Sequence, residues 1–212
     1  MFPLFLLRPQ WVKRMHGGFS VNWDPRAQLG GAPCNYSAMA LDTPNYEVER
    51  TIGRVEIRNY EPYLVASTIV RGSLQNAGNG GFGILARYIF GANDSGDGTS
   101  TKIAMTSPVL QVPDDEGFVV RFMMPHDFTT DSLPTPKDQR VTIDEVGAQR
   151  LAALQYRGRW SKSLHDRNLR ELRSALERDG LATEGEPIWA RYDPPWKPWF
   201  LRTNEVLLAV AD

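Results

Sequence analysis

The feature of this sequence that most constrains its fold is a similarity between its two halves at one fixed spacing. The segment VEIRNYEPYLVASTIVRG begins at Val55, and VTIDEVGAQRLAALQYRG begins 86 positions later, at Val141. Both segments have the same length and end in Arg-Gly. Similar segments at a constant spacing indicate an internal duplication, so we expect two pseudo-repeats, at about residues 55–125 and 141–211.

Two further pairs of positions follow the same spacing. Pro108 in TSPV lies 86 positions before Pro194 in DPPW, and Val119 lies 86 positions before Glu205. In the first repeat, β-branched and aromatic residues on both sides of the turn-forming NYEP predict two strands. We therefore expect each repeat to run strand, strand, helix, strand, strand, with residues 101–109 (TKIAMTSPV) as the third strand of the first repeat.

The helix of the second repeat has clear boundaries in the sequence. Residues 161–180 (SKSLHDRNLRELRSALERDG) begin with Ser161 and Ser163, either of which suits an N-cap, and end at Gly180. Their leucines recur at helical spacing and form one apolar stripe, which consists of Leu164, Leu169, Leu172 and Leu176.

The helix of the first repeat starts in a glycine-rich stretch. GNGGFG, residues 78–83, formally matches the dinucleotide-binding pattern, but that pattern needs a parallel strand-turn-helix unit and an acidic residue about 20 positions further on. The acids that follow, Asp94 and Asp97, fall in a Gly-Ser loop, so a flexible helix entry is the better interpretation. The apolar face of this helix comprises Phe82, Leu85 and Ile89.

Antiparallel hairpins with two helices imply an α+β domain. We expect an internally duplicated, distorted antiparallel β-barrel of about eight strands, with the two helices packed against it. Such a domain borders an apolar space between helix and sheet, which is where small-molecule sites commonly lie.

Composition excludes several classes of function. The chain has 212 residues, 42% hydrophobic and 23% charged, with a net charge of -1, so no global charge favours nucleic acid or an anionic membrane as a partner. Its single cysteine, Cys34, excludes an intramolecular disulfide framework and a cysteine-based zinc cluster. Three histidines leave few ligands for any other metal site.

The first 45 residues carry scattered Gly, Pro, Arg and Trp without a sustained period and are predicted to be a poorly ordered extension. Because acidic residues are absent until Asp24, the extension could be an organellar transit segment; equally, a natural start at Met39 would make it a start-site artefact. No run reaches the roughly 20 apolar residues of a spanning helix. We expect a cytoplasmic protein, with an organellar location as the alternative.

No catalytic constellation is visible. The serines lack a nucleophile-elbow context, and no histidine is paired with a nucleophile by any feature of the sequence. His165 stands among charged residues of the second helix and is expected to be solvated, and His126 is expected in a loop. We predict no catalytic residue, no metal ligand and no enzyme.

The C-terminal segment ARYDPPWKPWFLRTNEVLLAV combines tandem prolines, aromatic residues and cations. Trp196, Trp199 and Phe200 offer flat apolar surfaces beside Lys197 and Arg202, which suits a flat apolar ligand that carries carboxylates. The alternative is that these aromatic residues cap the barrel. Glu205, on the last strand, is either a buried carboxylate paired with an Arg or an exposed residue.

Several of these motifs together resemble the SOUL heme-binding family. KIAMTSPV, YIFGAN upstream and YDPPWKPWFLRTNEV downstream carry the resemblance, and YEVERTIGRVEIRNYEPYLVAST, RFMMP, LPTPKDQRV and ALQYRGRWS occur in the family's order. The resemblance covers about Tyr46 to Ala211. It implies a duplicated, distorted barrel with two helices that binds heme or related tetrapyrroles in a shallow apolar pocket. It also implies a more distant likeness to the effector-binding domains of small-molecule-sensing regulators.

The resemblance also implies which residues contact the ligand. Lys197 matches a lysine implicated in contacts with heme propionates, and Arg87 matches a helix lysine of the heme-binding members; an arginine of those members is Asn79 here. The position of a proposed histidine ligand of the iron is Asn59, so we expect heme or porphyrin without a histidine axial ligand. The predicted contacts are Arg87, Lys197, Phe82, Leu85, Ile89 and Trp196.

The sequence therefore predicts a soluble tetrapyrrole-binding protein that carries or buffers heme or porphyrin. The alternative is a sensor or binding module for other flat hydrophobic or cationic molecules, which an acidic residue such as Glu205 inside the pocket would favour. An enzyme that acts on such ligands is the third hypothesis.

Overall fold

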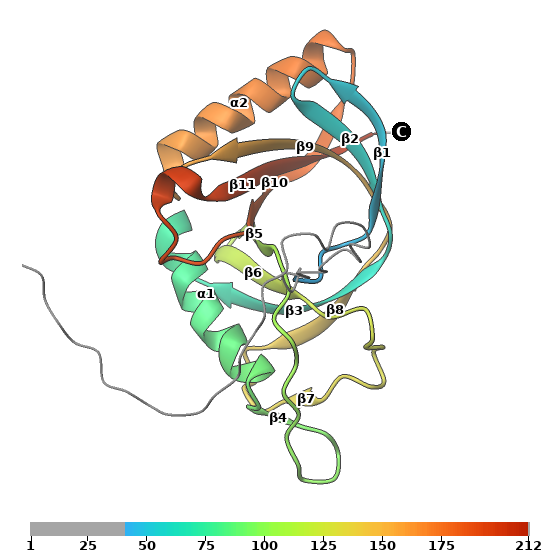
Figure 1. Cartoon of the computed structure of the whole chain (residues 1–212), viewed down its shortest axis with the longest axis vertical. Helices are drawn as coiled ribbons and strands as arrows, with labels where there is room; N and C mark the ends of the chain where they lie inside the picture. The colour runs from blue at the N-terminus through green and yellow to red at the C-terminus, as the bar shows by residue number, and fades with distance from the viewer. Residues whose placement is uncertain (1–40, 212) are drawn as a thin grey trace, which may run out of the picture. The chain divides into compact units, whose positions relative to one another are not determined.

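The computed structural model describes residues 41–211, so residues 1–40 of the predicted extension lie outside the described part (Figure 1). The described part contains one nine-stranded antiparallel sheet, a two-stranded sheet and two helices. The helices are α1 (Leu74–Ile89) and α2 (Lys162–Arg178). The strands are β1 (Tyr46–Ile52), β2 (Val55–Tyr60), β3 (Tyr63–Val70), β4 (Asn93–Asp94), β5 (Val109–Asp114), β6 (Gly117–Met123), β7 (Thr135–Pro136), β8 (Thr142–Val146), β9 (Gln149–Arg157), β10 (Thr183–Arg191) and β11 (Thr203–Val210).

The main sheet exchanges strands between the two halves of the chain. Its spatial order is β1-β2-β9-β11-β10-β5-β6-β3-β8. Apart from β1, exchanging β2, β3, β5 and β6 with β8, β9, β10 and β11, respectively, gives the same order read in reverse. Each half thus lends one strand to the other, β2 to β9 and β8 to β3, and the halves meet where β5 pairs with β10.

The sheet is open, which corrects the predicted barrel. The α+β class, the two helices and the antiparallel pairing are as predicted, but β1 and β8 are the two edges of the sheet and do not pair. The free edge of β2 is occupied by β1, in register from Tyr46 opposite Tyr60 to Ile52 opposite Val55. That edge is therefore unavailable to β8, and the sheet curves strongly without closing (Figure 1).

The expected strand at residues 101–109 is also wrong. Residues 101–108 form no strand, and the strand β5 starts only at Val109. The Ile103 N–H donates to the Ile89 carbonyl, and the Thr106 hydroxyl donates to the Met123 carbonyl. The long connection precedes β5 in the first half and follows β10 in the second, so Pro108 and Pro194 are not structurally equivalent.

Both helices cover the convex side of the curved sheet (Figure 1). Under α2, the side chains of Leu172 and Leu176 are fully buried against Leu154 and Val206. Under α1, Leu85 and Ile89 are buried in a second apolar cluster, which includes Val120 and Phe122 from β6. A third cluster, on the concave side, consists of Tyr60, Leu110, Leu151, Ala153, Ala190 and Leu207.

The glycines of α1 lie inside the helix and allow it to approach the sheet closely. Ser73 is the N-cap, and its hydroxyl accepts a hydrogen bond from the Asn76 N–H. A Cβ atom on Gly81 would lie 2.5 Å from the Cβ of Val120, whereas one on Gly83 would meet no atom within 4 Å. Gly81 is therefore required for packing, and Gly83 is not.

His165 is a core residue, contrary to the expected solvated position. Its side chain is buried, its Nδ1 is hydrogen-bonded to the Tyr156 hydroxyl, and its ring packs near Trp189. Burial, together with the charge of Arg191, lowers the pKa of His165 to about 4.

We expect Gly81→Ala to lower the free energy of unfolding by about 1–3 kcal/mol, because the new methyl group overpacks the contact with Val120. Gly83→Ala is the matched control in the same helix, and it should raise stability by about 0.5–1 kcal/mol through a less flexible unfolded chain. Urea denaturation measures both. Equal effects of the two substitutions would contradict the packing role of Gly81.

We also expect His165 to make stability depend on pH. The folded state keeps the His165 ring neutral, so the unfolded state binds the proton more tightly. The contribution of His165 to the free energy of unfolding is therefore fully present above pH 6.5, the ordinary pKa of histidine. It is lost as the pH falls from 6.5 to about 4, by about 3 kcal/mol in total. Urea denaturation at several pH values should show a smaller decline for His165→Gln than for the unaltered chain. Parallel pH profiles would refute the assignment.

Candidate functional site

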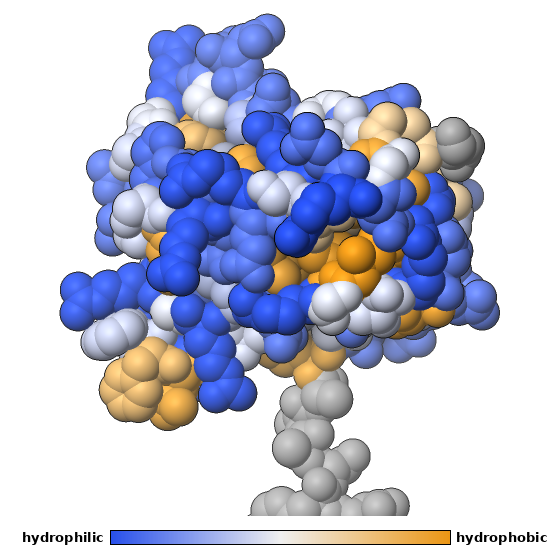
Figure 2. All heavy atoms as spheres, turned by 90° about the horizontal axis from the view of Figure 1, so that it is seen from above, coloured by the Kyte–Doolittle hydropathy of each residue, from blue (hydrophilic) through white to orange (hydrophobic). Residues whose placement is uncertain are grey.

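The connection from β10 to β11 carries most of the exposed aromatic surface. We call residues 193–202 the aromatic loop; it includes the short 3-10 helix η1 (Trp199–Leu201). Elsewhere in the described part, the exposed large hydrophobic side chains are spread along the chain, at Leu41, Tyr46, Val48, Ile69, Phe82 and Phe90. The face in Figure 2 is mostly hydrophilic with small, separate apolar areas. In the aromatic loop the exposed side chains are Trp196 (83%), Trp199 (47%), Phe200 (56%) and Leu201 (43%). Such a concentration of exposed apolar area marks an interaction site.

The aromatic loop is held in place by its own polar residues. Asp193 accepts hydrogen bonds from the Lys197 ammonium and the Thr203 N–H, each at 2.6 Å. Burial alone would raise the pKa of Asp193, but these bonds lower it overall. Arg202 donates from Nε to the Lys197 carbonyl at 2.8 Å and also donates to the Pro195 carbonyl. The exposed rings therefore stand on a fixed backbone.

Arginine side chains stack on two tryptophans, the exposed Trp199 and the partly buried Trp160. The Arg159 guanidinium lies 4.7 Å from the centre of the Trp199 ring. Arg191 and Arg202 stack on Trp160 at 4.7 and 4.6 Å, and Arg191 continues to the Leu74 carbonyl at the start of α1. Arg159 was not predicted as a site residue, because its proximity to Trp199 depends on how β9 lies beside the aromatic loop.

The structure separates the predicted site residues into three groups. Trp196 and Lys197 lie together in the aromatic loop. Arg87 is exposed in the last turn of α1, about 20 Å along the helix from its start at Leu74. Near Arg87 lies Asp138, whose pKa is lowered mainly by its hydrogen bonds with Arg140. The charge of Arg87 also contributes to lowering the pKa of Asp138. Arg87 therefore lies at the end of α1 that is farther from Leu74 and its contact with Arg191.

The apolar residues predicted on α1 are divided as well. Phe82 is 37% exposed, and its ring packs edge-on against Phe122 at 5.3 Å. Leu85 and Ile89 are 0% and 1% exposed. Both are fully enclosed by the sheet in this conformation, so they present no surface to a ligand.

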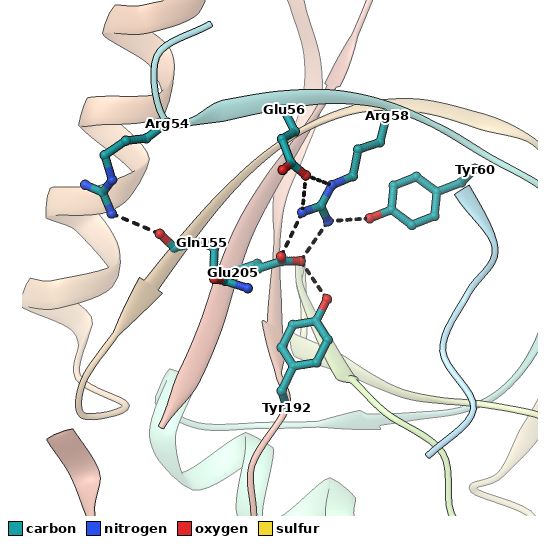
Figure 3. Close-up of polar contacts among 7 residues, drawn as sticks. All are labelled: Arg54, Glu56, Arg58, Tyr60, Gln155, Tyr192 and Glu205. Atoms are coloured by element: carbon teal, nitrogen blue, oxygen red, sulfur yellow. Dashed lines mark hydrogen bonds and ion pairs between the residues drawn. The ribbon is translucent and has the colours of Figure 1, made fainter. Parts of the chain in front are cut away.

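The concave side of the sheet holds a buried ion pair (Figure 3). The Arg58 guanidinium on β2 donates to both carboxylate oxygens of Glu205 on β11, at 2.9 and 3.0 Å. Tyr192 donates to the same carboxylate at 2.6 Å, and the Tyr60 hydroxyl accepts from Arg58 at 3.0 Å. Of the two alternatives for Glu205, the structure thus shows the buried, paired one. Glu56, at the exposed rim, adds a second carboxylate to Arg58 at 2.8 Å.

Burial controls the ionisation of this cluster. It raises the pKa of Tyr192 and Tyr60, and the negative charge of Glu205 adds to that effect. Burial alone would lower the pKa of Arg58, but the bonds to Glu205 and Tyr60 raise it overall. At neutral pH Arg58 is therefore charged, and Tyr60 and Tyr192 are neutral.

A cavity of about 80 Å³ lies beside the ion pair, and we call it the concave cavity. Its lining consists of Thr43, Pro44, Tyr46, Tyr60, Pro108, Leu110, Leu151, Ile188, Ala190, Tyr192 and Leu207. Sites for drug-sized ligands have volumes of roughly 300–1,000 Å³. The concave cavity is therefore too small for a tetrapyrrole.

The described residues offer no metal centre. Residues 41–211 contain no group of three or more His, Cys, Asp or Glu side chains placed to hold a metal ion. His165 is buried under α2, and His126 lies at the surface with its Nε2 3.1 Å from the Thr43 carbonyl oxygen. Neither helix within this range has the length and apolar character needed to cross a membrane.

These features define an α+β domain with an exposed aromatic and basic loop. The chain belongs to the SOUL heme-binding protein family, whose model matches residues 41–209. Heme-binding protein 1 of Sus scrofa is 32% identical over 132 residues, which are 59% of this chain and 67% of that protein. Heme-binding protein 1 of Bos taurus is 30% identical over 127 residues, which are 58% of this chain and 64% of that protein. The family and both relatives are named as heme-binding proteins and not as enzymes, in agreement with the prediction that this chain is a binding protein.

Solved structures with low sequence identity share the fold. The C-terminal domain of EcmrR has a TM-score of 0.57 at 13% identity and covers 79% of this chain and 98% of its own. A hydrolase from Listeria innocua has a TM-score of 0.51 at 14% identity and covers 77% of this chain and 94% of its own. At these identities the likeness concerns the fold alone.

We expect Arg58→Met to lower the free energy of unfolding by about 3–5 kcal/mol, because it leaves the buried Glu205 carboxylate without its countercharge. The double variant Arg58→Met/Glu205→Leu should recover much of this loss. Arg71→Met breaks an equally short but exposed pair, with Glu116 at 2.9 Å, and should cost less than about 1 kcal/mol. Urea denaturation compares the three; a double variant no more stable than Arg58→Met would contradict the pairing argument.

Proposed function

We propose that this protein binds heme or a related tetrapyrrole at the aromatic loop and acts as a carrier or buffer for it. The observation that carries this proposal is the exposed aromatic and basic surface of the loop in a member of the SOUL heme-binding protein family. Both mammalian relatives are named as heme-binding proteins.

The chemistry of the aromatic loop suits such a ligand. The Trp199 and Phe200 rings are nearly perpendicular, at 86°, so the loop would meet a flat macrocycle with ring faces and ring edges, and burial of apolar area contributes about 25 cal/mol per Å². Arg159, which stacks on Trp199, and Lys197, which is paired with Asp193, would supply the cations for propionates. Less the cost of association, this supports a dissociation constant on the order of 1 μM. Arg87, at the far end of α1, remains the other predicted propionate contact.

The residues beside the aromatic loop fit the macrocycle better than they fit an iron ligand. Among residues 41–211, the two histidines lie elsewhere, one of them fully buried, and position 59 is an asparagine whose side chain is bonded to Glu49. Binding would thus depend on the ring faces and the propionates. Iron-free protoporphyrin should then bind about as tightly as heme.

A second candidate function is a binding module for flat or cationic hydrophobic molecules. The observation that favours it is the presence of Glu205 on the concave side of the sheet. Arg58 already neutralises this carboxylate through two hydrogen bonds, so it offers little attraction to a cation. Tetrapyrrole binding is therefore our first choice.

The test is a parallel titration with hemin and iron-free protoporphyrin, followed by the Soret band. We expect similar, micromolar dissociation constants for the two ligands. Trp196→Ala should weaken both by about 10-fold through lost ring contact, and Lys197→Ala by about 2- to 5-fold through one exposed charge pair. Arg87→Ala tests the distant contact in the same way.

Phe90→Ala is the matched control, because Phe90, the C-cap residue of α1, is 60% exposed but lies outside the aromatic loop. It should leave both affinities unchanged. The proposal fails if neither ligand gives a saturable Soret change at micromolar protein. The placement at the aromatic loop fails if Trp196→Ala and Phe90→Ala have equal effects.

A further inference from the structure

The concave cavity has walls and a floor of different chemistry. Its walls are aliphatic and aromatic, with Leu110 and Ile188 from the strands at the centre of the sheet and Leu151 and Leu207 beside them. Its floor is the part of the lining formed by Tyr60 and Tyr192. Arg58 and Glu205 are not in the lining; they are 4% and 2% exposed and are hydrogen-bonded to Tyr60 and Tyr192, respectively. Apolar walls with a few fixed polar groups are typical of small-molecule sites.

The segment from residue 42 to 46 lies over the concave cavity as a strap. Thr43, Pro44 and Tyr46 contribute to the lining. The Asp42 carbonyl accepts from the Ser107 N–H at 2.9 Å, and the Asn45 carbonyl accepts from the Glu61 N–H at 3.1 Å. The strap is thus tied to loops on both sides, and the cavity is covered without being filled.

Tyr46 of the strap also contacts the polar floor. Its ring lies 4.4 Å from the Arg58 guanidinium and 4.9 Å from the ring of Tyr60. A planar aromatic guest would therefore meet two further aromatic rings, Tyr60 and Tyr192, in addition to the strap. Rings in such contact favour offset or edge-on packing with another ring.

The lining of the concave cavity contains no charged side chain, and the charges behind Tyr60 and Tyr192 are already paired, which determines the charge of the guest. The Glu205 carboxylate accepts two hydrogen bonds from Arg58 and one from Tyr192. A cation would have to displace Arg58 from this carboxylate. An anion would meet two carboxylates, Glu205 and Glu56, around one guanidinium. A buried charge without a partner is costly, so both charged classes are disfavoured.

One hydrogen-bond donor at the floor is left for a guest. The Tyr60 hydroxyl accepts a hydrogen bond from Arg58. Among the described residues, no acceptor is hydrogen-bonded to the proton of this hydroxyl. We propose that the concave cavity is a second ligand site, separate from the aromatic loop, for a neutral one-ring aromatic molecule that accepts a hydrogen bond from Tyr60. The volume of about 80 Å³ is about half that of a roughly 150 Å³ cavity that binds benzene, so part of the guest lies under the strap at the open side.

The test uses three planar probes of nearly equal shape and different charge, observed by fluorine NMR with the full-length protein. They are para-fluoroacetophenone (neutral), para-fluorobenzoate (anion) and para-fluorobenzamidinium (cation). We expect saturable binding of the neutral probe and at least about 10-fold weaker binding of both ions. Nuclear Overhauser contacts of the bound neutral probe should reach the methyl groups of Leu110 and Leu207.

Two variants and one control locate the site. Ala190→Phe should fill the concave cavity and abolish binding. Tyr60→Phe should weaken para-fluoroacetophenone by about 3- to 10-fold and leave para-fluorotoluene, which has no acceptor, unchanged. Trp196→Ala, in the aromatic loop, should bind the neutral probe as the unaltered chain does, and hemin should not displace the probe.

Each result decides the proposal. It is overturned if no probe binds saturably, if the cation or the anion binds best, or if Overhauser contacts of the neutral probe fall outside the lining of the concave cavity. Unchanged binding in folded Ala190→Phe overturns it too. If Ala190→Phe does not fold, the Overhauser contacts and Tyr60→Phe decide. Loss of hemin binding with retained probe binding would affect only the proposed tetrapyrrole function.

Discussion

The pairing of β5 with β10 at the centre of the sheet is the constraint on which the rest of this structure depends. It joins the two halves in antiparallel register, with Ala190 opposite Leu110 and Arg191 opposite Val109. Because each half also pairs one strand with the other half, neither half has a complete sheet of its own. The two halves therefore form one continuous sheet, and its curvature separates a convex side from a concave side.

The two sides of the sheet then meet different requirements. The convex side is covered by helices, and α1 approaches it so closely that Gly81 has no space for a side chain. Neither helix of residues 41–211 covers the concave side, and within this range its strands carry alternate side chains into the space under the strap. Arg58 and Glu205 point into this space from strands that are not neighbours in the sheet. Their charges can be buried there because each supplies the countercharge of the other.

Much of this fold was predictable, because the repeat spacing and the leucine stripe are properties of neighbouring residues. The open sheet was not, since it depends on β1, which precedes the repeat and takes the edge of β2. His165 could have been found: positions 165, 172 and 176 lie on one face of a helix, and all three are buried under α2. Its charged sequence neighbours hid that pattern.

The site was predictable where it is local and unpredictable where it depends on strand register. The run from Trp196 to Phe200 is continuous in sequence, so its aromatic and basic character was visible. Arg58 and Glu205 lie 147 positions apart, and only the order β2-β9-β11 brings them together. Likewise, Leu85 and Ile89 are buried because their face of α1 packs against β6. The sequence shows that this face is apolar, but it does not show whether the face packs in the core or contacts a ligand.

The duplication does not produce two equivalent sites, and the reason lies in the connections. In the first half, β5 and β6 are joined by a tight turn at residues 115–116, whereas the aromatic loop occupies the corresponding place in the second half. Val119 stands where the second half has Glu205, so the buried carboxylate also occurs once. The repeated strands supply a symmetric frame, and each candidate site arises where the two halves differ. Because the aromatic loop and the Arg58–Glu205 pair each occur once in the described residues, each of the two proposals calls for one binding site per chain.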